Sequence, residues 1–266
     1  MSLSVASLHL YPIKSLGGFA VNEARITDRG FEHDRRWMLV DGNGRFISQR
    51  EVATLACLHC SPNGDGFRVT DVRDGDAIDL PWSITGEVQR ATVWNDEVDV
   101  VHAPVAVSAW FSDKLAIACG LVHMPDASQR KVDAHYAQGI TSLSDGFPYL
   151  IISQASLDDL NARMEIPLPM ERFRPNIVIA GGSAFQEDGW KEVSIGTTRF
   201  ALVKPCGRCV ITTTDQRTGE RGKQPLRTLA TYRRRKGVEV EVKVDFGMNA
   251  MALKGDVVRV GDLVTE

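Results

Sequence analysis

Two cysteines separated by two residues are the most reactive side chains of this chain, in the segment Cys206-Gly-Arg-Cys209. A thiolate beside a cation such as Arg208 can be a metal ligand, a redox thiol or an inert core group. Redox dithiols of the thioredoxin type place the first cysteine at the N-terminus of a helix. The β-branched run Val210-Ile-Thr-Thr-Thr214 instead predicts a strand that starts at Cys209. This pattern disfavours a dithiol.

A second pair with the same spacing, Cys57-Leu-His-Cys60, would complete a four-thiolate zinc site. Residues 55–60, however, resemble a strand, on which these two side chains would point to opposite faces. We therefore predict that Cys57, Cys60 and Cys119 are buried structural residues. One thiolate of the second pair then remains for function. The adjacent Arg208 would help to keep it ionised, and a soft thiolate suits a soft or high-valent metal.

Two further groups of polar residues could bind an anion. Lys14 and Ser15 lie in a glycine-containing turn after a strand, where lysine and serine can hold an anionic oxygen. Arg35 and Arg36 follow one another on an expected strand, so that one can serve a pocket while the other is solvated. Further along the chain, residues 174 and 176 are an arginine and an asparagine two positions apart, and we expect both to project to one face of the chain as it enters a strand.

Composition excludes several classes of protein. The chain has 266 residues, a net charge of −3 and 43% hydrophobic residues, which is typical of a globular protein with no basic surface for nucleic acid. It contains no apolar run of membrane-spanning length and no signal peptide, so we expect a cytoplasmic protein that binds neither membrane nor nucleic acid. An odd number of cysteines, five, indicates reduced thiols or metal ligands.

The hydrophobic pattern predicts a mainly β protein with some helices (α+β). We expect helices at about 104–119, after Ser153 and at 225–235. Hairpins are expected at 36–48 and 88–102, with turns at Gly42-Asn-Gly44 and Asn95-Asp96. Further strands are expected at 3–12, 20–28, 176–180, 199–203, 209–214, 238–245 and 257–264. The best domain boundary lies near 118–124, and the polar segment 125–148 has the length of a functional loop.

Five segments of the chain resemble those of the MOSC-domain proteins and follow one another in the same order. This family is named for the C-terminal domain of molybdenum cofactor sulfurase. More narrowly, the chain is similar to the mitochondrial amidoxime-reducing component and its bacterial relatives. The resemblance covers nearly the whole chain, and a C-terminal Val260-Gly-Asp262 completes it. The five segments are Tyr11-Pro-Ile-Lys-Ser15, Asp34-Arg-Arg-Trp37, Ser144–Leu157, Phe173-Arg-Pro-Asn-Ile-Val178 and Arg208–Gly219.

The resemblance implies a molybdenum cofactor, in which a pterin dithiolene holds the metal and one protein cysteine is a further ligand. That role falls on Cys209 and not on Cys206. The implied contacts of the pterin phosphate are Lys14, Ser15, Arg35 and Arg174, with Asn176, Gly207 and Arg208 alongside, and Asp145, Phe147 and Asn249 at matching positions.

It also implies a fold and an activity. An N-terminal β-rich domain (1–118) would pack on a C-terminal MOSC β-barrel (119–266), with the cofactor between them. The implied activity is the reduction of small N-hydroxylated compounds such as amidoximes, hydroxylamines and hydroxylated base analogues. Some bacterial relatives carry a C-terminal ferredoxin domain with its own cysteines. This chain ends without such a cluster, so we expect a separate electron donor of the flavoprotein reductase, ferredoxin or cytochrome type.

One departure from the family pattern lies beside the site. Thr213-Thr214-Asp215-Gln216 stands where the family often has Thr-Thr-Val-Asp-Pro, and Gln216 replaces a rigid turn former. Two other interpretations remain open. The first is a cofactor-binding or sulfur-carrier module without its own turnover, and the second is a structural zinc protein that uses both cysteine pairs.

Overall fold

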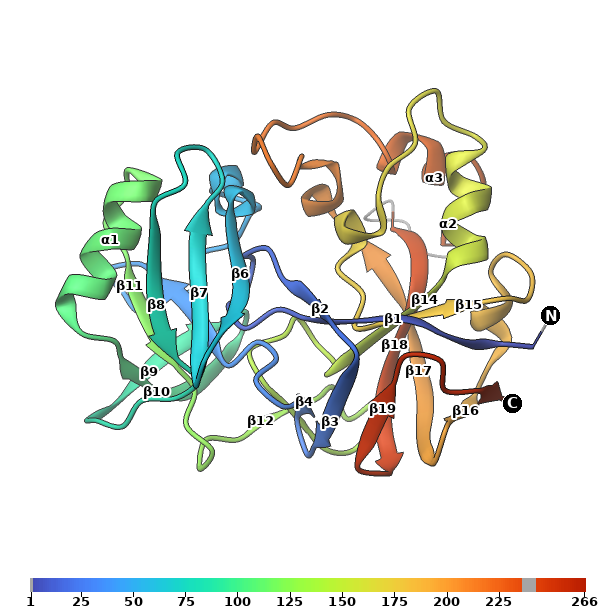
Figure 1. The fold of residues 1–266 in the computed structure, drawn as a ribbon, viewed down its shortest axis with the longest axis horizontal. Coiled ribbons are helices and arrows are strands. Elements are labelled where there is room, and N and C mark those ends of the chain that lie inside the picture. The colour runs from blue at the N-terminus through green and yellow to red at the C-terminus, as the bar shows by residue number, and fades with distance from the viewer. Residues whose placement is uncertain (1, 236–242) are drawn as a thin grey trace.

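The computed structural model describes residues 2–235 and 243–266, and it shows a mainly β molecule with two halves side by side (Figure 1). The right half in this view contains an eight-stranded sheet in the order β2-β1-β15-β14-β18-β17-β16-β20. Its strands are β1 (Ser4–Leu10), β2 (Phe19–Val21), β14 (Tyr149–Ser153), β15 (Ile177–Ala180), β16 (Glu192–Ile195), β17 (Thr198–Arg208), β18 (Val244–Lys254) and β20 (Val264–Thr265).

The first strand of the chain joins this sheet, although its sequence position is N-terminal. β1 pairs antiparallel with β15, with Leu8 opposite Ile177. Val5 and Leu8 are three residues apart, yet both are buried in the core that contains Tyr149 and Phe200, because a β-bulge shifts the register of the strand after Val5. The chain therefore starts in the right half before it builds the left half.

Within the described residues the eight-stranded sheet does not close into a barrel, and β2 and β20 remain its edges. The predicted closed barrel is therefore not seen. The backbone amide of Val5 donates to Asp262 O at 2.9 Å, and that of Val264 donates to Leu3 O at 3.0 Å. These bonds bring one end of the chain against the other without forming a continuous ladder.

The left half contains a four-stranded sheet, β5-β11-β10-β9, and a three-stranded sheet, β6-β7-β8. Helix α1 (Val105–Leu115) buries Phe111 and Leu115 in the core shared with the three-stranded sheet. The strands are β5 (Trp37–Val40), β6 (Leu58–Asn63), β7 (Gly66–Asp71), β8 (Ala77–Pro81), β9 (Val88–Val93), β10 (Asp96–His102) and β11 (Gly120–His123).

Short elements join the halves. The remaining strands are β3 (Glu23–Thr27), β4 (Gly30–Phe31), β12 (Arg130–Lys131), β13 (Ile140–Thr141) and β19 (Val257–Arg259). Helices α2 (Gln154–Asn161) and α3 (Leu226–Tyr232) lie on the right half, and the 3-10 turns are Ala53–Cys57, Met170–Phe173, Gln186–Gly189 and Val210–Thr213. The predicted division of the chain at 118–119 stays a prediction. Strand β11 follows this point in the sequence, and it pairs with β5 and β10 of the left half.

Several predicted elements are confirmed in place. Helix α1 begins directly after Pro104, and Ser153 caps α2 by accepting a hydrogen bond from Ser156 N. β9 and β10 form the predicted hairpin, but Asp96 pairs with Val93, so the two-residue turn lies at residues 94–95, one residue before the predicted turn. The third predicted helix is shorter than expected and ends at Tyr232.

Other elements differ from prediction. The expected strand 20–28 is divided into β2 and β3, and 257–264 into β19 and β20. In the hairpin at 36–48 only the first arm is a strand, and the second pairs through the single bridge between Val40 and Phe46. Residues 238–242 of the expected strand 238–245 lie outside the described residues, and β18 begins at Val244.

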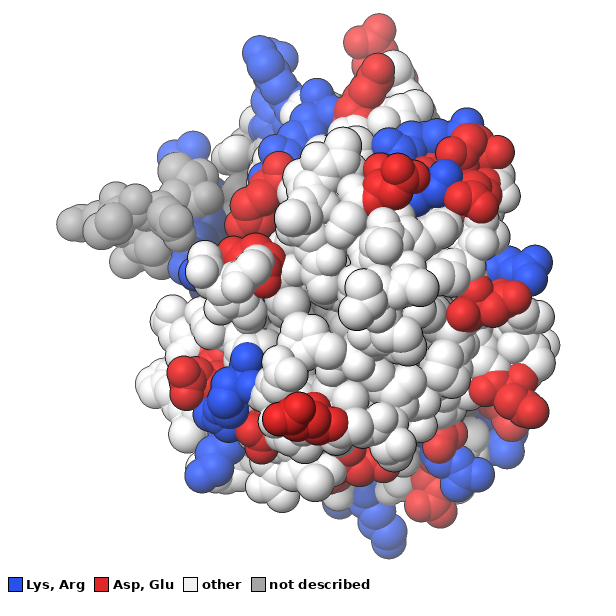
Figure 2. All heavy atoms as spheres, turned by 90° about the vertical axis from the view of Figure 1, so that its left-hand side faces the viewer, with Lys and Arg blue, Asp and Glu red and all other residues white. Residues whose placement is uncertain are grey.

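The left half carries charges of both signs on its surface. Arg68 pairs with Asp79 at 2.8 Å, and Lys114 pairs with Asp74 at 2.9 Å. Figure 2 shows this side of the molecule, where blue and red side chains lie next to one another around a wide uncharged area. Such mixed charge is ordinary for a globular surface, and in the described residues of this face it gives no stripe of one sign.

Candidate functional site

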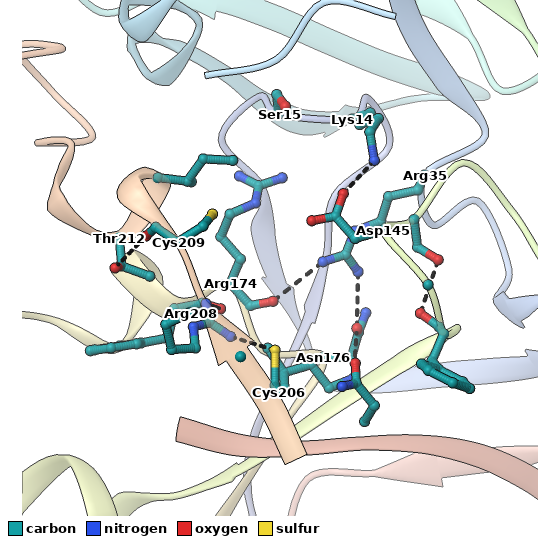
Figure 3. Close-up of a pocket in the computed structure, with 18 of the residues that line it drawn as sticks. Lys14, Ser15, Arg35, Asp145, Arg174, Asn176, Cys206, Arg208, Cys209 and Thr212 are labelled. Carbon is teal, nitrogen blue, oxygen red and sulfur yellow. Dashed lines mark hydrogen bonds and ion pairs between the residues drawn. The ribbon is translucent and has the colours of Figure 1, made fainter. Parts of the chain in front are cut away.

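A pocket between the two halves brings together all eleven predicted site residues (Figure 3). They come from six places in the chain: the turn after β1, the segment before β5, the loop before β14, the entry to β15, the end of β17 with the residue that follows it, and β18. The lining includes Lys14, Ser15, Arg35, Asp145, Phe147, Arg174, Asn176, Gly207, Arg208, Cys209 and Asn249.

Three of these residues have a left-handed backbone. The φ angles of Ser15, Arg35 and Arg174 are 69°, 49° and 55°. This region is uncommon for residues other than glycine and concentrates at functional sites, where the surrounding contacts enforce it. Each residue stands at a sharp change of chain direction, so that its side chain lines the pocket. Arg35 therefore lies in a turn and not on the predicted strand.

Lys14 forms the buried end of an ion pair. Its Nζ donates to Asp145 Oδ1 at 2.6 Å and to Leu143 O at 3.0 Å, while the lysine side chain is only 4% exposed. Burial lowers the pKa of Lys14 to about 8, against the opposing effect of the Asp145 charge. The Asp145 side chain, in contrast, is 57% exposed at the mouth of the pocket. The pocket walls around it remove part of its water and act to raise its pKa, but the charges of Lys14 and Arg50 outweigh this effect and hold the pKa well below its ordinary value.

Arg35 is held by a buried polar network. Its Nη1 donates to Asp34 Oδ2 at 2.5 Å and to Asn176 Oδ1 at 2.9 Å. The Asn176 amide also accepts from Leu150 N and donates to His9 O and Asp34 Oδ2. Both donors and both acceptor positions of this amide are thus taken by the protein. Asn176 lines the pocket, and its geometry makes it a positioning residue for Arg35.

Arg174 and Arg35 enclose one aromatic ring. Their guanidinium groups lie 4.3 Å and 4.4 Å from the centre of the Tyr11 ring, within the range of cation–π attraction. Arg174 also donates to Leu16 O at 2.5 Å. Burial lowers the pKa of Arg174 to about 10, with the Arg35 charge acting in the same direction. Two arginines held this close indicate a site that is built for negative charge.

The segment after Cys209 is not a strand, and this prediction was wrong. Strand β17 ends at Arg208, and Val210–Thr213 form a 3-10 turn that begins beside Cys209. The hydroxyl of Thr212 donates to Cys209 O at 2.9 Å, and that of Thr213 donates to Val210 O at 2.7 Å. Threonine hydroxyls can bond back to carbonyls three residues earlier, and here these local bonds override the β propensity of the run.

Arg208, which was predicted to act on the Cys209 thiolate, has other partners in the structure. Arg208 donates from Nη1 to Cys206 Sγ at 3.0 Å and from Nη2 to Phe173 O at 2.6 Å, so that its terminal nitrogens bind Cys206 and the backbone (Figure 3). The cation that faces Cys209 from the opposite wall of the pocket is instead Arg50. Burial acts to lower the pKa of Arg50, but its interactions with the Asp145 carboxylate and with Cys209 outweigh this effect and raise the pKa.

The sequence prediction missed Arg50 and several other residues of the lining. Arg50 lies in the left half, in a segment with no recognisable motif, and no local pattern indicates that it reaches residues far along the chain. Cys206 lines the pocket as well, although the resemblance gives the role of metal ligand to Cys209 and not to Cys206. The other lining residues that were missed are Ser144, Gly146, Tyr149, Leu150, Phe173, Ile211 and Thr212.

Of the other three cysteines, two are buried as predicted, whereas Cys119 is only partly buried. Cys57 and Cys60 are buried, and burial raises the pKa of Cys60 to about 12. The strand predicted around them is in part a 3-10 turn, Ala53–Cys57, followed by β6. Among the described residues, no three Cys, His, Asp or Glu side chains form a group that could hold a metal ion. The zinc site of four thiolates is therefore not assembled in this part of the chain.

The pocket carries an excess of positive charge. Five cations line it and one carboxylate, that of Asp145, faces them; the cations are Lys14, Arg35, Arg50, Arg174 and Arg208. Asp34 behind Arg35 adds one further negative charge. Gly207 presents bare backbone to the pocket, and a Cβ there would meet no protein atom closer than 3.7 Å. These residues fit an anionic, phosphate-bearing group with a thiolate, Cys209, at one side.

Comparison with known proteins identifies the family. The model of the MOSC N-terminal beta barrel domain matches residues 2–118, and that of the MOSC domain matches residues 138–265. The chain is 34% identical to mitochondrial amidoxime-reducing component 1 of Mus musculus, over 86% of this chain and 71% of the relative. The chain belongs to the MOSC-domain family of the amidoxime-reducing components.

Other members of the family share the same range of identity. Mitochondrial amidoxime reducing component 2 of Homo sapiens is 34% identical, over 86% of this chain and 72% of the relative. Molybdenum cofactor sulfurase of Homo sapiens is 30% identical over 93% of this chain, which corresponds to 30% of that longer protein. These MOSC relatives associate the chain with the molybdenum cofactor. In the described part of the chain no helix has the length and apolar character needed to cross a membrane.

Proposed function

We propose that this MOSC protein is a molybdenum-cofactor-dependent reductase of N-hydroxylated compounds that receives electrons from a separate donor protein. The observation that carries the proposal is the position of Cys209 at the edge of a pocket with surplus positive charge. The names of relatives about a third identical to the chain support the same activity.

The cofactor fits the chemistry of the lining. Its phosphate would be bound by Lys14, Ser15, Arg35 and Arg174, since guanidinium and ammonium groups are the natural partners of phosphate. Cys209 would supply the thiolate ligand of the metal. When bound, the cofactor supplies the two-electron redox chemistry that an N–O bond requires.

The protein supplies orientation and charge. Asn176 and Asp34 hold Arg35 from behind, so that the guanidinium is preorganised before any ligand arrives. Asp145 keeps one carboxylate oxygen on Lys14 and the other on Arg50, and this carboxylate can also accept a hydrogen bond from an amino group of the pterin. Phe147 and Phe173 give the pocket apolar walls.

The test separates the two thiols of the pocket. The full chain is co-expressed with the cofactor-synthesis machinery, and molybdenum per chain and reduction of benzamidoxime with an artificial electron donor are measured. We expect Cys209→Ser to lose both, and Cys206→Ser to keep the metal. Absence of molybdenum from the saturated parent protein, or full activity of Cys209→Ser, would refute the proposal.

A second candidate function is a cofactor or sulfur carrier. Two thiols, Cys206 and Cys209, line one pocket, and a molybdenum cofactor sulfurase contains the same domains. In that case the loaded protein would transfer cofactor or sulfur to an acceptor enzyme and would not reduce benzamidoxime. The two functions are therefore distinguished by turnover of the loaded parent protein.

A further inference from the structure

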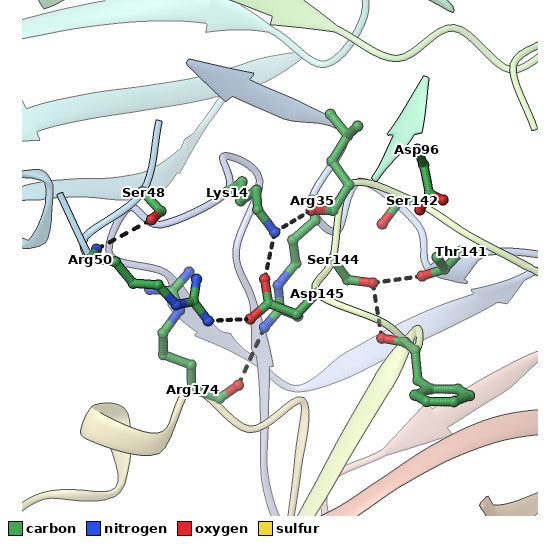
Figure 4. A network of polar contacts seen from close by, with 12 residues as sticks. Lys14, Arg35, Ser48, Arg50, Asp96, Thr141, Ser142, Ser144, Asp145 and Arg174 are labelled. Carbon is green, nitrogen blue, oxygen red and sulfur yellow. Dashed lines mark hydrogen bonds and ion pairs between the residues drawn. The ribbon is translucent and has the colours of Figure 1, made fainter. Parts of the chain in front are cut away.

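Arg50 reaches the pocket from the wall opposite most of the predicted site. It lies in the left half, just before the 3-10 turn Ala53–Cys57, and its Nη2 donates to Asp145 Oδ2 at 3.2 Å (Figure 4). Its side chain is 24% exposed. The two residues that it faces, Asp145 and Cys209, belong to the right half of the pocket.

Contacts on its side chain and on its backbone hold Arg50 in place. Its guanidinium lies 4.5 Å from the centre of the Trp94 ring, which supports one side of the group. Behind it, Arg221 Nη2 donates to Arg50 O at 2.8 Å and also to the carbonyl of Gln49. A long side chain supported at its ring contact and at its backbone loses less freedom when it binds a ligand.

One nitrogen of this guanidinium lacks a partner. Arg50 Nη1 is buried and has no hydrogen-bond acceptor in the described protein. Buried polar groups without a partner are rare, and such a group calls for an explanation such as a missing ligand. The other terminal nitrogen shares the Asp145 carboxylate with Lys14, so that one negative charge faces two cations.

We propose that Arg50 is a further ligand-binding residue of this pocket, which donates to an oxyanion on the Cys209 side of the bound group. The inference rests on the proposed function, because it takes the ligand to be the anionic molybdenum cofactor. Arg50 comes from the left half and Cys209 from the right, so a ligand held by both would join the two walls of the pocket.

The experiment measures anion binding by the full chain without cofactor. Inorganic molybdate and inorganic phosphate are titrated, and their dissociation constants are obtained from thermal shifts for the parent, Arg50→Gln, Arg50→Lys and Arg45→Gln. Arg45 is the matched control: it comes from the same part of the chain and contacts an aromatic ring, Phe46, but it is exposed and outside the pocket lining.

We expect molybdate to bind about tenfold more weakly to Arg50→Gln, because the variant loses one charge-assisted hydrogen bond. A tenfold change in the dissociation constant corresponds to about 1.4 kcal/mol. Arg50→Lys should recover part of the affinity, and Arg45→Gln should match the parent. Equal molybdate affinities for Arg50→Gln and the parent would overturn the inference. If Arg50→Gln does not fold, a crystal structure of the parent with molybdate decides, because an oxyanion bonded to Arg50 Nη1 supports the inference and one placed elsewhere contradicts it.

A second readout separates this inference from the proposed function. Molybdenum per chain after co-expression should fall in Arg50→Gln and stay at the parent level in Arg45→Gln. If the parent itself takes up no molybdenum while Arg50→Gln still weakens molybdate binding, the proposed function fails and the role of Arg50 in binding an oxyanion stands. If the parent takes up molybdenum and Arg50→Gln equals it in both measurements, only the role of Arg50 fails.

Discussion

Replacement of Asp34 by asparagine tests the network that holds Arg35. Asp34 is 1% exposed and accepts hydrogen bonds from Arg35 Nη1 at 2.5 Å, Tyr11 N at 2.8 Å and Asn176 Nδ2 at 3.1 Å. The variant keeps the shape of the side chain but removes its charge. It leaves the Arg35 guanidinium, also nearly buried, without its counter-ion.

Breaking a buried ion pair by removing one partner costs about 3–5 kcal/mol, because the other charge stays desolvated. We therefore expect Asp34→Asn to lower the free energy of unfolding by about that amount. For a chain of this size each kcal/mol corresponds to roughly 2–4 °C, which predicts a fall in Tm of about 6–20 °C. Because Arg35 loses its fixed position, binding of phosphate to the pocket should weaken as well.

The assay is urea unfolding followed by circular dichroism, together with thermal unfolding, of the parent and two variants. Asp79→Asn is the control, because Asp79 pairs with Arg68 at 2.8 Å on the surface, where its side chain is 53% exposed. Such a pair contributes about 0–1 kcal/mol. A loss in Asp34→Asn no larger than that in Asp79→Asn would refute the argument that Asp34 stabilises Arg35 as a buried counter-ion.

Two other predictions concern glycine and pH. Gly207→Ala should leave Tm unchanged, because the added Cβ would meet no protein atom closer than 3.7 Å. The same variant should reduce molybdenum per chain if the cofactor lies against this backbone. Gly247→Ala should lower Tm, because the φ of Gly247 is +80° and the added Cβ would lie 2.6 Å from Ile152. Equal melting temperatures for these two variants would contradict the packing described. The pKa of Lys14 is lowered by burial from 10.5 to about 8, so phosphate affinity should fall as the pH rises through about 8. Between pH 8 and 10.5 the unfolded chain holds more protons than the folded chain, so Lys14 should make stability rise with pH in that window. Urea midpoints and phosphate titrations across this range, compared with Lys14→Met, test both effects, and a pH dependence that Lys14→Met retains would contradict the assignment.

Some features of this protein could be predicted from local sequence. Helix α1 follows Pro104, and α2 follows its Ser153 cap, because capping and apolar periodicity are properties of adjacent residues. The alternation of the apolar residues Leu8 and Leu10 likewise predicts a strand. Local pattern failed after Cys209, where hydroxyl-to-carbonyl bonds of Thr212 and Thr213 produce a 3-10 turn in a run of high β propensity.

By itself, the sequence determined the chemistry of the site: a thiolate, a set of basic residues and an ordered series of motifs that resembles one family. These are properties of residue types and of short segments, which do not depend on how the chain folds. Only the tertiary structure decided which groups meet. Arg208, the neighbour of Cys209 in sequence, binds Cys206, whereas Arg50 reaches Asp145 across a separation of 95 residues and faces Cys209. The physical reason is that the contact of Arg50 with Asp145 is set by the packing of the left half against the right half, and no local propensity encodes it.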